Sequence, residues 1–303
     1  MLHGNEPIQA DCRQNAADTL HMLLQITGKI KLERCYKRPE WSHIRQYLTI
    51  DGITTGIMPG DESPFEILVN LRKHYIRLRN ATGKEIRIPL ENKVSISEYY
   101  KQISQALKHI GSPTRIFVRP QEFYDSIDFD KDEKHASYDK YAVNLFLDNL
   151  HFAYLALKEF MSPFRGKVTY PAYYFGTMDL SGIIYSGESE PFETTDKISL
   201  HAFDERSCEF GFWPGDPIFH KPSFYVMPYP FILSIDHYGN ILRPDQAVFK
   251  PEKKEFFLTL EDVFRHDQPT EAVIEFFKSS FTILQQLKKW NNFDWITHQL
   301  SYS

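Results

Sequence analysis

The chain has 303 residues, of which 42% are hydrophobic and 15% aromatic, so it can bury a sizeable core as one large domain or two of ordinary size. Charged residues make up 25% and the formal net charge is −5, values that exclude a disordered chain and argue against a general nucleic-acid-binding protein, which needs a concentrated basic face. No segment is apolar for the length that a bilayer requires, and the N-terminus lacks a basic region followed by an apolar run, so we expect neither a membrane protein nor a secreted one.

The cysteines are few and widely separated: Cys12, Cys35 and Cys208. This spacing excludes CxxC zinc and redox motifs. An odd, sparse set is typical of free thiols in a reducing compartment, so we expect a cytoplasmic protein.

A helix is predicted after residues 1–15, which we interpret as a flexible N-terminal arm. Apolar side chains cover most of the circumference of this helix, as is typical of a largely buried one. Gly28 is expected to end it. Its polar residues form one narrow stripe, because His21, Gln25 and Lys29 follow one another at i, i+4 spacing.

A run of short strands is predicted next. Segments of alternating or β-branched character are separated by turns rich in Gly, Pro, Asp and Asn, which is the pattern of an antiparallel meander. The predicted strands are residues 43–50, 65–71, 74–80 and 84–90.

The following helix has a clear start signal. Ser95, with Glu98 three residues later, forms a capping box, and Gly111 comes directly after the periodic run. These signals predict a helix over residues 96–110. A strand at residues 114–118 is expected to complete the first half of the fold.

The rest of the chain repeats this order of elements. Ser137 or Asp139 can cap a long helix that Pro163 stops, and a final helix is predicted over residues 270–290. The strands predicted between these two helices cover residues 170–185, 208–213, 223–227, 231–235 and 256–260.

Two runs of sequence echo each other, DGITTGIMPGDESPFE at residues 51–66 and LSGIIYSGESEPFE at residues 180–193. With the repeated order of elements, the echo predicts an internal duplication, and chance similarity between Gly- and Pro-rich loops is the alternative. We therefore predict an α+β fold of two diverged helix–antiparallel sheet–helix halves. The predicted divisions, packed as one globular unit, are residues 1–15 (arm), 16–120 (first half), 121–134 (acidic connection) and 135–303 (second half).

Several short motifs occur in one order along nearly the whole chain. They are Thr19-Leu20-His21-Met22, Gln25, Gly28-Lys29, Trp41, His43, Tyr47, Thr54-Thr55, Phe65-Glu66, His135-Ala136-Ser137-Tyr138-Asp139, Gly166-Lys167, Asp179-Leu180, Ser186-Gly187 and Gly211-Phe212-Trp213-Pro214-Gly215.

This ordered set resembles a bacterial domain-of-unknown-function family, the one numbered 5996. The chain differs from the family pattern at Leu23, where a second Trp is common, and at residues 173–176, where a Trp-Gly pair is commoner. An aromatic pocket at these two places therefore cannot be carried over from the family pattern. The family has no known activity, so the resemblance implies motifs and no mechanism.

The first candidate site is the stripe of His21, Gln25 and Lys29, because a polar stripe on an otherwise apolar helix can face an interior cleft. A histidine titrates near neutral pH and can carry a proton, an amide can orient a carbonyl group, and an ammonium can bind an anion. The alternative is that the stripe is only the solvated face of an amphipathic helix.

The second candidate is the polar cluster that begins at His135 and includes Tyr138 and Asp139. A cluster of this kind at a helix start can bind an anion through free backbone N–H groups, and the alternative is an ordinary N-cap. Glu66 is retained among the acidic residues of the echo because it follows a Phe at the start of a strand. Trp213 belongs to an aromatic cluster that either walls a pocket or packs in the core.

The sequence indicates no metal site and no cofactor class. The best set of metal-ligating residue types, His21, His43, His135 and Glu66, has no HxH or HExxH spacing. The motifs GxSxG, GxGxxG and GxxxxGK[ST] are absent, which argues against a serine nucleophile elbow and against the common nucleotide-phosphate cradles.

We expect these candidates to line a cleft between the two halves that accepts a small molecule. The lead hypothesis is a small-molecule enzyme with His21 or His135 as general acid/base, and the alternative is a non-catalytic protein that binds a ligand or a partner. The sequence decides neither this question nor the oligomeric state. The predicted substrate-binding residues are Gln25, Lys29, His43, Tyr47, Glu66, Tyr138, Asp139, Lys167, Asp179 and Trp213.

Overall fold

A computed structural model describes residues 10–216, 218–235, 237–288 and 290. The chain divides into two compact units, which are described separately below. Unit 1 comprises the chain up to Lys37, His43–Asn149 and Tyr173–Met178. Unit 2 comprises Arg38–Ser42, Leu150–Ala172 and the chain from Asp179 onward.

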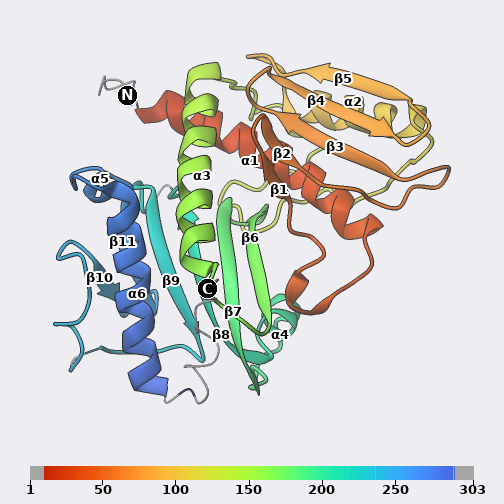
Figure 1. Ribbon diagram of the computed structural model, residues 1–303. Coiled ribbons are helices and arrows are strands. Elements are labelled where there is room, and N and C mark those ends of the chain that lie inside the picture. Colours follow the sequence, from red (N-terminus) through yellow and green to blue (C-terminus); the bar gives the residue numbers. More distant parts are fainter. Residues whose placement is uncertain (1–9, 217, 236, 289, 291–303) are drawn as a thin grey trace, which may run out of the picture. The chain divides into compact units, whose positions relative to one another are not determined.

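Unit 1 contains an antiparallel five-stranded sheet whose strands follow one another in chain order (Figure 1). Each strand pairs with the next, which confirms the meander predicted over residues 65–90. The segment 51–64 was predicted to be a loop throughout, which is wrong for residues 52–54, because they pair with the strands on both sides. The strands are β1 (Tyr47–Thr49), β2 (Gly52–Thr54), β3 (Phe65–Asn70), β4 (Tyr75–Asn80) and β5 (Glu85–Pro89).

The first helix of unit 1, α1 (Ala10–Arg34), is longer than predicted and passes straight through Gly28. The expectation that Gly28 ends the helix is wrong, and the reason is close packing. A Cβ placed on Gly28 would lie 2.1 Å from the Phe175 ring, so the missing side chain makes room for that ring beside the helix.

The second helix of unit 1, α2 (Ile96–His109), starts where the capping signal placed it, since the Ser95 hydroxyl accepts a hydrogen bond from the Glu98 N–H at 3.3 Å. Gly111 follows with a φ of +73°, a left-handed conformation that suits glycine. The strand predicted at residues 114–118 is wrong, because this segment forms no ladder and continues into the long connection before the next helix.

The long helix α3 (Lys140–Met161) begins in unit 1 and ends in unit 2. The Asp139 carboxylate accepts hydrogen bonds from the N–H groups of Tyr141 and Ala142 at 2.8 and 3.1 Å, which confirms that Asp139 can cap this helix.

Unit 2 is built on a six-stranded antiparallel sheet with the strand order β10-β11-β9-β8-β7-β6 (Figure 1). The end of α3 and the helices α4 (Lys197–Ala202), α5 (Leu260–Val263) and α6 (Pro269–Lys288) belong to this unit, and of these α4 and α5 were not predicted. A strand predicted at residues 231–235 is wrong, since no ladder forms there. The elements are β6 (Val168–Tyr174), β7 (Asp179–Ser189), α4, β8 (Glu205–Trp213), β9 (Ser223–Tyr229), β10 (Val248–Lys250), β11 (Glu255–Thr259), α5 (Leu260–Val263) and α6 (Pro269–Lys288).

The two faces of the six-stranded sheet differ in character. On one face aromatic side chains pack against α6, as in the contacts of Phe210 with Phe277 and Phe281 at ring-centroid distances of 5.5 and 5.8 Å. On the other face the register brings Asp179, Glu209 and Tyr225 together from three adjacent strands. The sheet is therefore apolar toward its helix and polar on its opposite face.

Helices and two antiparallel sheets together confirm the predicted α+β class. The predicted duplication of the two halves stays a prediction. Across the residues that the structure describes, no helix is both long and apolar enough to cross a membrane.

Candidate functional site

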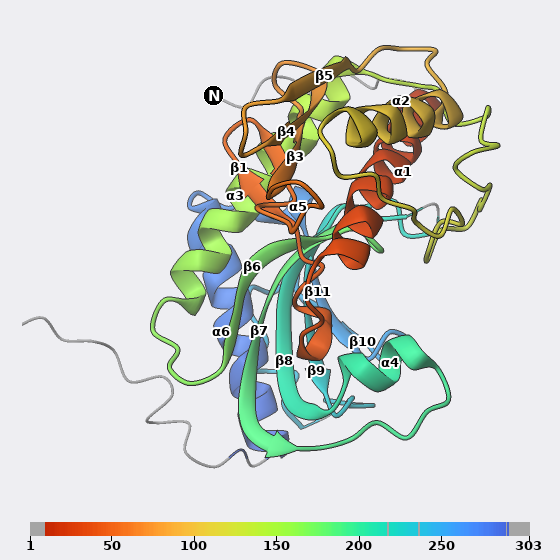
Figure 2. The same ribbon diagram turned by 90° about the vertical axis from the view of Figure 1, so that its right-hand side faces the viewer.

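The polar stripe of α1 is buried rather than solvated, since His21, Gln25 and Lys29 are 7%, 0% and 5% exposed. The connection between α2 and α3 lies along it, and we call residues 113–124 the strap (Figure 2, yellow-green beside the red α1). The strap runs antiparallel to the helix. The contacting pairs are Arg34 with Thr114, Lys29 with Phe117, Gln25 with Gln121, His21 with Phe123, and Asp18 with Tyr124.

His21 is fully engaged with backbone carbonyl groups. Its Nε2 lies 2.9 Å from the carbonyl oxygen of Phe175 and 3.0 Å from that of Gly176. Carbonyl oxygens only accept, so Nε2 carries the proton of a neutral ring. Burial lowers the pKa of His21 to about 4, although the two carbonyl groups work in the opposite direction. His21 therefore holds the segment around Phe175 against α1 and offers no free nitrogen at that edge.

Gln25 clamps the strap. Its amide nitrogen donates to the Gln121 carbonyl at 2.7 Å, and its amide oxygen accepts from the Gln121 N–H at 2.8 Å. Both ends of the side chain are thus occupied by one peptide group of the strap. This pairing satisfies the buried amide and leaves it little capacity to bind a substrate.

His135 has a different environment, because one of its ring nitrogens is oriented and the other is open. Nδ1 lies 2.7 Å from Oδ2 of Asp132, a carboxylate that is 0% exposed. Oδ1 of the same carboxylate accepts the backbone N–H groups of Lys134 and His135 at 3.1 and 3.0 Å. This arrangement fixes the proton on Nδ1 and leaves Nε2 to exchange a proton.

The start of α2 lies beside Asp132. Its own carbonyl oxygen accepts the Ser97 N–H at 3.0 Å in the first turn of α2, and the carbonyl oxygen of His135 accepts the Ile96 N–H at 3.0 Å. The carboxylate therefore lies near the positive end of that helix and accepts three hydrogen bonds.

Further carboxylates surround His135. Nε2 lies 3.6 Å from Oδ2 of Asp125, which is too long for a hydrogen bond, and Asp18 acts on the ring electrostatically. Burial works to lower the pKa of His135, but Asp132 and, with it, Asp125 and Asp18 raise it above its ordinary value. At neutral pH this histidine holds its second proton more tightly than a free one.

One aromatic ring links the two predicted catalytic histidines. Phe123 packs edge-on against His21 and His135, with ring centroids 5.3 and 5.5 Å away. The structure thus brings His21, Gln25 and His135 together in unit 1. Their roles differ, since only His135 combines an oriented ring with an open nitrogen.

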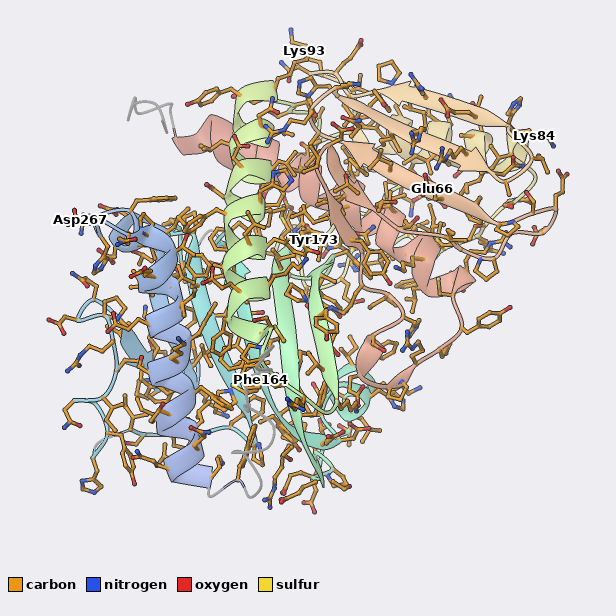
Figure 3. All side chains as sticks on the ribbon, in the orientation of Figure 1. Glu66, Lys84, Lys93, Phe164, Tyr173 and Asp267 are labelled. Carbon is orange, nitrogen blue, oxygen red and sulfur yellow. The ribbon has the colours of Figure 1, made fainter. Side chains whose placement is uncertain are left out.

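Other predicted residues of unit 1 have structural partners. The Tyr138 hydroxyl lies 3.0 Å from Nδ1 of His74, and burial raises the pKa of Tyr138. Oε1 of Glu66 accepts hydrogen bonds from Arg77 and Arg79 at 2.9 and 2.8 Å on the surface of β3 and β4 (Figure 3). These contacts explain the two side chains without a ligand.

The remaining three predicted residues of unit 1 lie elsewhere. Asp139 caps α3, and His43 is 6% exposed in the segment before β1. Tyr47 is half-exposed on β1, and the Lys31 ammonium lies 4.3 Å from its ring centroid.

Unit 2 holds a second polar cluster, on the face of the sheet opposite α6. The Tyr225 hydroxyl lies 2.8 Å from Oδ2 of Asp179 and 2.9 Å from Oε1 of Glu209. A Cβ on Gly211 would lie 2.4 Å from the Tyr225 ring, so glycine lets this ring cross the neighbouring strand toward both carboxylates. Burial and the two carboxylates together raise the pKa of Tyr225, which keeps the hydroxyl protonated.

Glu255 belongs to the same cluster. Burial raises its pKa to about 7, and the charges of Glu209 and Asp179 add to this effect while Lys253 opposes it. A carboxyl group that titrates near neutral pH is a candidate proton carrier. Sequence reasoning selected Asp179 and missed Glu209, Tyr225 and Glu255, because only the strand register places them together.

The last two predicted residues also lie in unit 2. Trp213 stacks on Phe219 with ring centroids 6.0 Å apart, at the end of β8. Lys167 pairs with Glu40 and with Glu205, the latter at 2.7 Å, and its ammonium lies 4.2 Å from the Tyr185 ring centroid. A cleft shared by these residues and those of unit 1 stays a prediction.

Metal ligands do not gather in the part of the chain that the structure describes, where no group of three His, Cys, Asp or Glu side chains could hold a metal ion. His21 and Glu66, two members of the metal set considered above, are engaged by backbone carbonyl groups and by arginines respectively.

Comparison with known proteins gives a family and no function. A family model, described as a family of unknown function (DUF5996), matches residues 7–295, which confirms the resemblance seen in the sequence motifs. No curated protein and no solved structure matches the chain.

Proposed function

Because the chain belongs to DUF5996, a family of unknown function, its chemistry has to be inferred from its own geometry, and we propose that it is an enzyme that uses His135 as general acid/base on a small molecule. The observation that carries this proposal is the 2.7 Å contact between Nδ1 of His135 and the buried Asp132 carboxylate, with Nε2 left open. A carboxylate in this position fixes the tautomer and stabilises the imidazolium.

The shifted pKa of His135 supports a role as general acid as well as general base. The raised pKa of His135 makes its ring protonated more often than a free imidazole at the same pH, so Nε2 can give a proton to a leaving group and take one back. Asp132 acts as a positioning residue, since it touches His135 and no group beyond the local backbone in the region described.

His21 has a supporting role in this proposal. Its Nε2 is bound to two carbonyl groups and its pKa is lowered to about 4, so it contributes by holding the Phe175 segment and by packing on Phe123. The catalytic role suggested for either histidine is therefore proposed for His135 alone.

The test compares wild-type protein with His135→Gln in a mixture of small metabolites followed by mass spectrometry. We expect the wild type to consume at least one compound, and the variant to do so about 10²–10⁴-fold more slowly, the range that general acid/base catalysis supplies. His109→Gln is the control, because His109 is exposed in the last turn of α2 and has no part in the proposed reaction.

The variant Asp132→Asn distinguishes a positioning role of Asp132 in catalysis from a purely structural role in folding. The amide cannot stabilise the imidazolium, so the rate should fall and the acidic limb of its pH profile should move to lower pH. Equal consumption by wild type and His135→Gln contradicts the proposal. A compound that is retained but never converted favours the alternative, a non-catalytic ligand-binding protein.

A further inference from the structure

Lys29 has a buried side chain whose amine has no polar partner among the described residues. The residue is 5% exposed, and its ammonium nitrogen lies 5.3 Å from the centroid of the Phe117 ring on the strap. Within the described residues it has no hydrogen-bond acceptor and no carboxylate at ion-pair distance. The nearest acid to act on it is Glu33, one turn further along α1, and it does so only electrostatically.

A second buried lysine on the same helix shows what a partnered amine looks like. Lys31 is 3% exposed, donates a short hydrogen bond to the Arg45 carbonyl and lies over the Tyr47 ring at 4.3 Å. Buried charges are as a rule paired, so the contrast between the two lysines needs an explanation.

The surroundings of Lys29 favour its neutral form. Burial lowers the pKa of Lys29, and the charge of Glu33 only partly opposes this. The neighbouring polar side chain on the stripe, Gln25, has both amide atoms bound to Gln121 and cannot solvate the amine. A neutral amine carries a lone pair, which makes it a nucleophile toward carbonyl carbon.

The amine is near the surface despite its burial. Phe117, the ring that lies over it, is itself 72% exposed, so the aromatic contact of the amine faces the solvent. An exposed aromatic ring beside an unpartnered amine provides an apolar wall for a small ligand. We propose that Lys29 is a covalent binding site for a small aldehyde or ketone, which it holds as an imine beside Phe117.

The chemistry balances without an oxidant or a cofactor. The amine nitrogen forms a bond to the carbonyl carbon, and a proton moves from nitrogen to the former carbonyl oxygen, which gives a carbinolamine. The carbinolamine then loses its hydroxyl group and the remaining N–H proton as water, which leaves the C=N bond. This site does not depend on the function proposed for His135.

The experiment uses propionaldehyde as the probe, with sodium cyanoborohydride to reduce each imine to a stable secondary amine. The full chain is treated near pH 7 and the labelled lysines are identified by peptide mass spectrometry. We expect at least about tenfold more label at Lys29 than at Lys101, whose side chain is 65% exposed, because a desolvated amine is more often unprotonated. Label at Lys29 should saturate as the aldehyde concentration rises, whereas label at Lys101 should rise linearly.

Three variants make the result specific. Phe117→Ala should abolish saturation at Lys29, and Lys29→Met should remove the fast-labelled position while leaving Lys101 unchanged. His135→Gln should label like the wild type, so a failure of the acid/base proposal is distinguishable from a failure of this one. Preferential label at Lys31, or equal and linear label at Lys29 and Lys101 in the wild type, overturns the proposal.

Discussion

The side-chain amide of Gln25 and the backbone of Gln121 form a two-point pair, with N–H to O distances of 2.7 and 2.8 Å between donor and acceptor atoms. The Gln25 side chain thereby gives the backbone of Gln121 the two hydrogen bonds that a neighbouring strand would otherwise supply. The buried stripe of α1 is, over this stretch, a docking surface for the chain's own connection.

Gln25→Leu tests this relationship. The substitution keeps a similar volume but leaves the N–H and the carbonyl of Gln121 without partners, so we expect the unfolding free energy to fall by about 2–3 kcal/mol. Hydrogen exchange followed by mass spectrometry should show faster exchange across the strap. The control is Gln102→Leu, which removes only a bond to Glu98 on the surface of α2. Unchanged hydrogen exchange in the strap would contradict the conclusion that Gln25 holds the strap in place.

His21 and His135 should titrate in opposite directions from the ordinary histidine value of 6.5. The pKa of His21 is lowered to about 4 by burial, while Asp132 and its acidic neighbours raise that of His135. Two-dimensional NMR of the imidazole resonances, assigned with His21→Gln and His135→Gln, should find a titration midpoint at about pH 4 for the first ring and above 6.5 for the second. Similar titration midpoints would remove the distinction between their roles.

The stability consequences of the two histidines have opposite signs. The unfolded chain binds a proton to His21 more readily than the folded one, so the unfolding free energy should fall as pH drops from 6.5 toward 4, by about 3 kcal/mol in total. For His135 the folded state binds the proton more tightly. Its contribution is therefore complete below the unfolded pKa and is lost as pH rises through the folded one. Urea unfolding of His21→Gln should lack the acid-side loss.

Glu255 should make the protein less stable as the solution becomes neutral. Its folded pKa of about 7 lies above the ordinary 4.5, so the folded state binds more protons in this window and the unfolding free energy falls with rising pH, by up to about 3 kcal/mol. Glu255→Gln should remove this slope and be more stable than the wild type near pH 7.5. The control is Glu252→Gln, at an exposed position in the preceding turn. If the unfolding free energy of Glu255→Gln falls with pH as steeply as that of the wild type, another group causes the pH dependence.

Local signals in the sequence were sufficient for the elements that local chemistry determines. The hydroxyl of Ser95 and the carboxylate of Asp139 accept backbone N–H groups within a few residues of themselves, so α2 and α3 start where the sequence predicts. The meander of unit 1 was predictable for the same reason, since its turns and its alternation lie within consecutive residues.

Contacts between residues far apart in the sequence determine the parts of the fold and of the candidate site that the sequence did not predict. The β-branched character of residues 114–118 predicted a strand, but α1 and not another strand lies beside the strap. The candidate site was predictable only in part, because His135 follows Asp132 closely whereas Tyr225 and Glu255 join Asp179 through strand register. Spacing along one helix correctly grouped His21 and Gln25, but it could not show that their polar atoms bind backbone groups far along the chain.

Gly28 and Phe175 provide the sharpest test of such a contact. Glycine inside a helix normally costs about 1 kcal/mol relative to alanine, so Gly28→Ala would stabilise a free-standing α1. Here the new Cβ would lie 2.1 Å from Cδ1 and 2.8 Å from Cβ of Phe175, which are distances that require Phe175 to move. Overpacking of this kind costs about 1–3 kcal/mol, so we expect Gly28→Ala to lower the unfolding free energy.

A double-mutant cycle isolates this clash. Phe175→Ala alone should cost about 3–5 kcal/mol, because it empties a fully buried ring site. When Gly28→Ala is added to Phe175→Ala, the clash is gone and helix propensity should make the second change neutral or stabilising by up to about 1 kcal/mol. Urea unfolding of the four proteins measures the coupling. A stabilising effect of Gly28→Ala in the wild-type background would show that Phe175 yields freely, and that α1 does not need glycine at this position.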